Sequence, residues 1–205
     1  ASVVQQAPIA TSATVAVTAD QGSITMADTS TSTTDTGALT YQAATDIALS
    51  QLLSSSGAIS VTADSDTNGS GSITDNSRDD STANLSTSAL VTLVAAQGIG
   101  STEAINTTVD TLTATNSTSG DIAIKESDGL IIAANGVVTA AGDGNIALAV
   151  AAGDLSIEQA VTAHGAGQVT LDADVGTLTI NARVKSTSGA IAITGASVAQ
   201  QAPIA

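Results

Sequence analysis

The 205-residue chain lacks most of the side chains that fill a wide protein interior. It has no Phe, no Trp and a single Tyr (Tyr41), although 42% of its residues are apolar. These apolar residues are nearly all Ala, Val, Ile and Leu. A wide globular core needs large side chains, whereas a narrow coil filled by stacked aliphatic side chains does not. The composition therefore favours a thin core.

Cysteine is absent and basic residues are scarce. Without Cys, an oxidising compartment is neither required nor excluded. The chain carries 4 basic and 19 acidic residues, a net charge of -15, which excludes the basic stripe of a nucleic-acid-binding surface and disfavours adhesion to an anionic membrane. No apolar run is long enough to insert into a membrane, and the first residues lack the pattern of a secretion signal. If the protein is exported, we expect its signal to lie outside this chain.

Residues that could support catalysis are few. The only histidine, His164, lies in a Gly-rich turn, where we expect it to be exposed. No Cys or second His can complete a nucleophilic or metal-binding set around it. Asp172 and Asp174 point the same way on a strand and indicate an outward acidic pair. We therefore expect no enzyme activity and no required cofactor.

A short pattern, Gly-x-apolar-x-apolar, is repeated through residues 144–193. Units begin at Gly144, Gly153, Gly167, Gly176 and Gly189. The alternation is typical of a strand with one buried face, and the glycine marks the corner where the backbone turns. The interval between successive leading strands in this region leaves room for three short strands in each coil. The pattern predicts an all-β chain folded as a parallel β-helix, or β-solenoid.

The coils can be counted from the first apolar residue of each leading strand. The seven steps between these residues, with a closing step of 19 residues to Val15 of a next copy, predict eight coils in one 195-residue period. Among them, Ile146, Val169 and Ile191 are expected to stack as one aliphatic ladder. The full series is Val15, Leu39, Ile59, Val91, Ile122, Ile146, Val169 and Ile191.

The two ends of the chain have nearly the same amino-acid sequence. Residues 1–10 read ASVVQQAPIA and residues 196–205 read ASVAQQAPIA, so that nine of the ten positions match. The match indicates a single β-solenoid segment, 1–205, made of one 195-residue repeat and the first ten residues of the next. We expect the parent chain to continue with a segment like Thr11–Val17. Copies would stack head to tail, as covalent repeats or as separate chains, and advance roughly 38 Å per eight coils.

Four polar or ambiguous segments interrupt the pattern. Residues 29–36, TSTSTTDT, predict a protruding turn or loop because they lack apolar residues. Residues 46–53, DIALSQLL, predict strand rather than helix because a second face is due there. The steps on either side of Val91, from Ile59 and to Ile122, are the longest of the series. They predict two long coils with insertions, at residues 63–88 and 106–120.

The first insertion contains a candidate calcium loop. Asp64, Asp66, Asn68, Gly69 and Asp75 occupy positions 1, 3, 5, 6 and 12 of a DxDxNG pattern. Oxygens at positions 1, 3, 5 and 12 can converge on Ca²⁺, and the glycine permits the sharp turn. A plain acidic turn is the alternative, because Asp, Asn and Gly favour turns through backbone geometry alone.

The Gly-led units also carry a family resemblance. Residues 120–124 (GDIAI), 144–148 (GNIAL), 153–157 (GDLSI), 176–180 (GTLTI) and 189–193 (GAIAI) resemble the filamentous-haemagglutinin-type repeats of very large bacterial surface proteins. This resemblance covers residues 120–193 well and the first half of the chain loosely. It implies a right-handed parallel β-helix, an extracellular or cell-surface location in bacteria, and a role as a stalk, fibre or adhesin. It carries over no functional residue.

Two functions are consistent with these observations. In the first, the chain is a structural repeat of an extracellular filament, sheath or surface fibre. In the second, it is an adhesin-type stalk that displays the polar loops at residues 29–36 and 64–80 to cell-surface glycans. Specific binding that is lost when a loop is deleted would favour the second.

Overall fold

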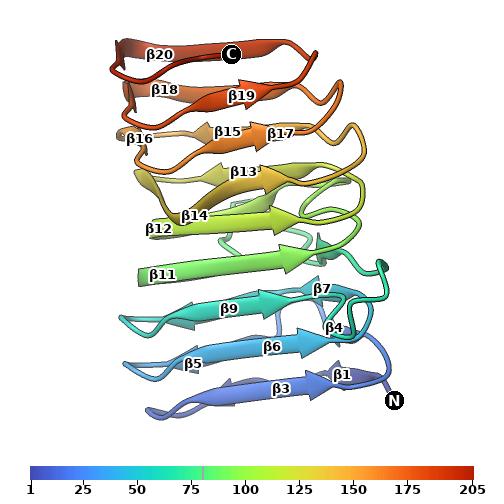
Figure 1. Ribbon diagram of the computed structural model, residues 1–205. Helices are drawn as coiled ribbons and strands as arrows, with labels where there is room; N and C mark the ends of the chain where they lie inside the picture. The colour runs from blue at the N-terminus through green and yellow to red at the C-terminus, as the bar shows by residue number, and fades with distance from the viewer. Residues whose placement is uncertain (80) are drawn as a thin grey trace.

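The computed structural model describes residues 1–79 and 81–205, which form one right-handed coil of parallel strands (Figure 1). In Figure 1 the near strands run left to right and the far strands run right to left while the chain climbs from its N-terminus, which makes the coil right-handed. All regular elements in these residues are strands, and none is a helix able to cross a membrane. Each turn of the coil has three faces, here named A, B and C in chain order.

Face A is a continuous ladder of nine inward-pointing aliphatic residues, one from each turn. Each pairs in parallel register with the next: Val3, Ile24, Ile47, Ile73, Ile99, Ile122, Ile146, Val169 and Ile191. The strands of face A are β1 (Val3–Gln5), β4 (Ile24–Met26), β7 (Ile47–Leu49), β10 (Ile73–Asp75), β13 (Ile122–Glu126), β15 (Ile146–Val150) and the first parts of β18 (Val169–Ile180) and β20 (Ile191–Gln200).

Face B follows face A in every turn and is the least regular of the three. In the lower turns it contains β2 (Ile9–Ala10), β5 (Thr31–Thr34), β8 (Gln51–Ser54) and the first part of β11 (Leu85–Ala95). The upper turns use part of β12 (Ile105–Asn116), the first part of β14 (Leu130–Thr139), β16 (Leu155–Ile157) and the second parts of β18 and β20.

Face C closes each turn. Its strands are β3 (Val15–Ala19), β6 (Leu39–Ala43), β9 (Ile59–Thr62), the last parts of β11, β12 and β14, β17 (Val161–Ala163) and β19 (Val184–Ser186). A bridge from Val184 to Ile204 completes the last turn. The three faces enclose one core.

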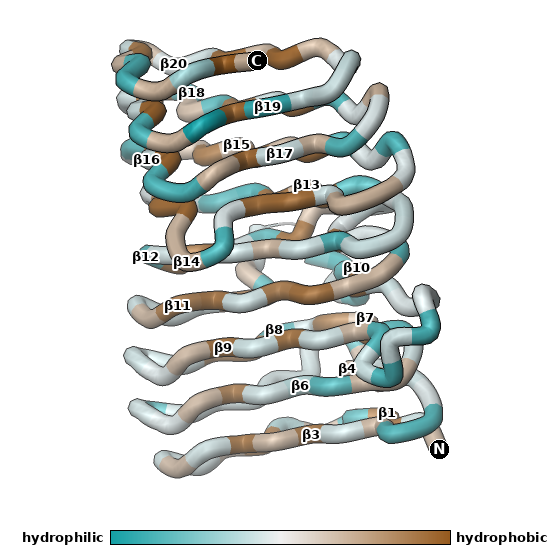
Figure 2. The backbone as a smooth tube through the Cα atoms, viewed as in Figure 1, coloured by the Kyte–Doolittle hydropathy of each residue, from teal (hydrophilic) through white to brown (hydrophobic). Residues whose placement is uncertain are grey.

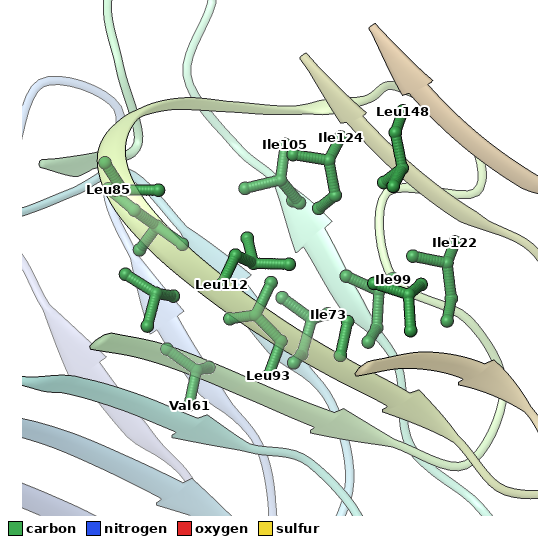
Figure 3. Close-up of a cluster of buried hydrophobic side chains, with 14 of the residues drawn as sticks. Val61, Ile73, Leu85, Leu93, Ile99, Ile105, Leu112, Ile122, Ile124 and Leu148 are labelled. Carbon is green, nitrogen blue, oxygen red and sulfur yellow. The ribbon is translucent and has the colours of Figure 1, made fainter. Parts of the chain in front are cut away.

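The core is a narrow aliphatic column, as the composition predicts. Side chains from all three faces meet inside the coil, among them Ile99 from face A, Leu85 from face B and Leu93 from face C (Figure 3). Apolar residues recur at matching places in successive turns (Figure 2). In β15, Ile146 and Leu148 are buried while the intervening Ala147 is exposed, which is the alternation that the sequence predicts. The predicted ladder of Ile146, Val169 and Ile191 is confirmed.

Glycines at one corner let successive turns approach closely. A Cβ on Gly144 would lie 2.0 Å from the carbonyl oxygen of Gly120, and one on Gly167 would lie 2.2 Å from that of Gly144. No side chain fits at either place, because real Cβ atoms do not approach backbone atoms so closely. The repeated glycine of the sequence is therefore a packing requirement at this corner.

The predicted coil series is wrong at one step. Val15, Leu39, Ile59 and Val91 lie on face C, whereas Ile122 and the residues after it lie on face A. The true face C partner of Val91 is Leu112, which comes well before Ile122 in the chain. The step from Val91 to Ile122 is therefore one turn plus one further face, and not a long coil with an insertion.

The two ambiguous segments have different outcomes. The strand prediction for residues 46–53 is confirmed by β7 and β8. The loop prediction for residues 29–36 is wrong, because Thr31–Thr34 forms β5 between β2 and β8. Ser32 and Thr34 of β5 point inward and are buried. Their hydroxyls find partners inside the coil, so this strand needs no large apolar residue.

The two copies of the repeated ten-residue sequence lie on different faces of the coil. Val3 lies in the first turn of face A, whereas Val198 pairs with Leu178 on face B of the ninth turn. Ile9 likewise lies on face B, and Ile204 on face C. The repeat therefore spans eight turns plus one face, instead of the eight turns predicted.

Candidate functional site: a buried polar corner

Polar side chains replace aliphatic ones in the middle turns, where face A bends into face B. In the turns below, Met26 and Leu49 fill the inward end of face A. In the next turns Asp75 and Glu126 take inward positions near this corner, and the buried residues Asn84 and Asn106 lie beside them. We name Asp75, Asn84, Asn106 and Glu126 the polar corner.

Asp75 is the centre of a hydrogen-bond network that spans three turns of the coil. It ends β10, and its Oδ1 accepts hydrogen bonds from Asn84 Nδ2 at 2.6 Å and from Ser77 N at 2.6 Å. Its Oδ2 accepts a longer one from Asn106 Nδ2 at 3.4 Å. Asn84 is fully buried and also donates to the Ser50 carbonyl at 3.0 Å. Because buried amide groups are costly without partners, this network fixes the path of the chain where it re-enters the coil at β11. The insertion predicted at residues 63–88 is therefore not one loop, because Ile73–Asp75 within it forms β10 of face A.

Glu126 is a fully buried carboxyl at the end of β13. Its Oε2 accepts hydrogen bonds from Thr107 Oγ1 at 2.7 Å and Val109 N at 3.1 Å, and its Oε1 accepts one from Ser127 N at 2.9 Å. Burial nevertheless raises the pKa of Glu126 from its ordinary value of 4.5 to about 7, because desolvation of the charged form outweighs these donors. The group can therefore change charge near neutral pH.

A small cavity opens beside Glu126. Its volume is about 110 Å³, well below the roughly 300–1,000 Å³ of a typical ligand pocket. Its lining residues include Thr82, Asn106, Thr107, Lys125 and Glu126. The cavity brings one carboxyl of raised pKa and one Lys from the same strand near several hydroxyls. Chemically the corner can exchange a proton and bind small polar groups.

Sequence reasoning missed the polar corner, although the signal for Glu126 was present. In IAIKE, residues 122–126, alternation points Ile122, Ile124 and Glu126 to the same side. A Glu in the third inward position predicts a buried carboxyl. Asn84 and Asn106 give no comparable signal, because neither follows a run of alternating apolar residues.

Three of the predicted calcium ligands, Asp64, Asp66 and Asn68, share one turn, whereas the fourth, Asp75, lies apart from them. In the turn after β9, Asp64 Oδ1 accepts a hydrogen bond from Gly69 N at 3.0 Å, and Asp66 Oδ2 accepts one from Asn68 Nδ2 at 2.8 Å. Asp75 lies at the far end of β10 in the polar corner. Within residues 1–79 and 81–205, no group of three or more His, Cys, Asp or Glu is placed to hold a metal ion. Calcium binding by this segment stays a prediction.

The other residues that the sequence singled out face outward from the coil, and of these Asp172 is half-buried. His164 is exposed in its turn, as expected, and its Nδ1 lies 2.7 Å from the Gly142 carbonyl oxygen. Asp172 and Asp174 share the outward side of β18, and Asp174 is exposed. These groups lie far along the chain from the polar corner, and no hydrogen bond joins them to it among the described contacts.

Comparison with known proteins gives no relative to guide the interpretation. No family model, no curated protein and no solved structure matches the chain. The resemblance of the Gly-led units to filamentous-haemagglutinin-type repeats therefore stays a prediction from residues 120–193.

Proposed function

We propose that the chain is a structural repeat of an extracellular filament or surface fibre, in which each copy continues the coil of the one before. One observation carries this proposal: the aliphatic ladder of face A runs without a break through all nine described turns, and the apolar interior is left uncovered at both ends of the coil. The apolar residues there are half-buried, namely Val3 and Ile9 in the first turn and Ile191 and Ile204 in the last. A further turn on either end would bury them.

The strand edges support the same proposal. The last turn pairs only with the turn below it, so its upper N–H and C=O groups face outward along the axis. Unpaired edges of this kind are templates for further strands. Among the described residues no helix or loop lies across either end (Figure 1). Stacking of one end on the opposite end of the next copy is an open arrangement, which builds filaments and not closed rings.

Burial favours continuation energetically. Val198 points inward on face B, yet it is 48% exposed because nothing covers it. Ladder residues that have a turn on both sides, such as Leu155 and Leu178, are fully buried. Completing the burial of an aliphatic side chain is worth on the order of 1 kcal/mol, and each added strand also gains a row of hydrogen bonds.

Small-angle X-ray scattering on the 205-residue chain and on a two-repeat protein, residues 1–195 followed by 1–205, tests the proposal. A continuous coil predicts an unchanged cross-section and a length that grows by about 40 Å, from the strand spacing of roughly 4.8 Å per turn. Two globules joined by a flexible linker would contradict it.

A further inference from the structure

The positions of the two copies of the repeated ten-residue sequence determine how consecutive repeats are oriented. Val3 and Ile191 are the first and ninth members of the face A ladder, so eight turns separate them. Val198, the counterpart of Val3, lies one face further along, on face B. One repeat thus spans eight and one-third turns.

We infer that each 195-residue repeat is rotated by one face, about 120°, relative to the repeat before it, so that residues on face A in one copy have their counterparts on face B in the next. This inference rests on the proposed continuation of the coil. The inference also identifies the surfaces that meet. Face A of the last turn pairs with the β3 segment of the following copy, although β3 itself lies on face C in the present chain.

The repeated ten-residue sequence forms the same corner in the first turn and in the last turn. Gln5 Nε2 donates to the Ala7 carbonyl at 3.2 Å, and Gln200 Nε2 donates to the Ala202 carbonyl at 3.0 Å. The first corner joins face A to face B, whereas the second joins face B to face C. The same residues therefore fit two different corners of the coil, as a rotated repeat requires.

The open end also matches the segment that would follow it. On face A, Ile191 and Ile193 point inward and are half-buried. Ile9 of the second copy is the counterpart of Ile204, which lies above Val184 on face C. In the present chain seven residues lead from Val184 on face C to Ile191 on face A, and in the second copy six residues lead from Ile9 to Val15. The two spacings differ by one residue, so Val15 can reach the position above Ile191. Val15 and Val17 have the same two-residue spacing as Ile191 and Ile193, so both pairs can stack with Ala16 over Ala192 on the outside.

The rotation has a consequence for the surface of the fibre. The polar segment between β10 and β11, in its described residues 76–79 and 81–84, lies where face A bends into face B in one copy. Its counterpart would lie between faces B and C in the next, and between faces C and A in the third. Three repeats then make 25 turns, or roughly 120 Å at about 4.8 Å per turn, before the pattern recurs. The polar loops are thereby distributed around all three sides of the fibre.

Engineered disulfides in the two-repeat protein test the inference, because the chain has no cysteine of its own. One variant carries Ala192→Cys in the first copy and Ala16→Cys in the second, which are adjacent if the repeat is rotated. The other carries Lys185→Cys with the same Ala16→Cys, which are adjacent only if Val15 stays on face C above Val184. Neighbouring strands place paired Cα atoms about 4.8 Å apart, within the range that a disulfide spans.

A matched control checks the geometry within one copy. Thr170 and Ala192 are outward-facing partners on β18 and β20, so the double variant Thr170→Cys with Ala192→Cys should oxidise to a disulfide in the 205-residue chain. Yields are compared by mass spectrometry without reductant. We expect the control and the 192–16 pair to form disulfides with similar yields and the 185–16 pair to form little.

The outcomes separate the inference from the proposed function. A disulfide of the 185–16 pair alone would overturn the rotation and leave the continuous coil intact. If neither pair forms while the control does, the second copy does not continue the coil, and both the rotation and the proposed function are wrong.

Discussion

Individual polar residues fix the register between particular neighbouring turns. A column of aliphatic side chains does not by itself fix the register between turns, since one Ile can stack on another in several registers. A buried carboxyl or amide does fix the register, because in any other register its hydrogen-bonding groups would be left without partners. Asp75 and Glu126 impose that requirement in the middle turns, and the cluster of Gln5, Ser32 and Tyr41 imposes it in the first two.

Glu126 should make stability depend on pH. Its folded pKa is raised from 4.5 to about 7, so the folded state binds the proton more tightly than the unfolded chain does. The stabilisation is therefore complete below about pH 4.5 and is lost as the pH rises through 7. We expect the free energy of unfolding to be larger at pH 5.5 than at pH 8, by on the order of 1–3 kcal/mol.

Urea unfolding of wild type and Glu126→Gln at both pH values measures this contribution. The comparison is needed because the net charge of -15 also changes with pH in both proteins. The variant should show the smaller difference between pH 5.5 and pH 8. Equal differences in the two proteins would exclude Glu126 as the source.

Tyr41, the only aromatic residue, is fully buried and hydrogen-bonded. Its hydroxyl donates to Gln5 Oε1 at 2.6 Å and lies 2.5 Å from Ser32 Oγ. Replacing it by Phe keeps the ring and leaves these groups with one partner fewer. We expect Tyr41→Phe to lower the free energy of unfolding by about 1–2 kcal/mol, whereas Thr40→Val on the outward side of the same strand should change it little. Equal effects of the two substitutions in urea titrations would contradict this role.

Strands and corners form the next scale, where glycine and aliphatic ladders act together. The alternation of apolar residues in 144–193 was sufficient to predict strands, corners and the Ile146 ladder. It failed for Thr31–Thr34, because a strand whose inward side chains are Ser and Thr lacks the apolar signal on which the prediction depends. It also failed between Val91 and Ile122, since the period of a triangular coil does not identify which of three similar faces a residue occupies.

The glycine corner gives a sharp contrast between two substitutions. A Cβ at Gly167 would lie 2.2 Å from the Gly144 carbonyl oxygen, whereas the nearest atom to one at Gly129 would be 3.6 Å away. Neither residue has a positive φ, so the comparison isolates packing from backbone strain. We expect Gly167→Ala to lower the melting temperature by several degrees and Gly129→Ala to leave it nearly unchanged. A tolerated Gly167→Ala would show that the turns can move apart at this corner.

The aliphatic ladder should not accept a charge. Val169 is fully buried between Ile146 and Ile191, and an Asp there would have no cationic partner. We expect Val169→Asp to cost about 4 kcal/mol or more in the free energy of unfolding, because a charge would enter a dry core. Thr170→Asp on the exposed side of the same strand is the matched control, with an expected change under about 0.5 kcal/mol. Similar urea midpoints for the two variants would argue against the ladder.

At the scale of the whole molecule, the chain is a rod whose stability depends on contacts between neighbouring turns. The sequence was sufficient to predict the solenoid and its narrow core, whereas the tandem repetition stays a prediction. It could not give the number of turns in a repeat, because that depends on the face to which each strand belongs. The polar corner was also hidden, since its members come from three separate turns and become neighbours only when the coil is formed.

Fibre diffraction from an aligned tandem polymer of the 195-residue repeat tests the account most directly. A continuous coil predicts a reflection near about 4.8 Å along the fibre axis, from strands stacked turn upon turn. Eight and one-third turns per repeat add an axial spacing of about 40 Å, with a full period of about 120 Å that reflects three rotated copies. The same reflection perpendicular to the axis, or diffuse scattering without an axial repeat, would contradict the stacked coil.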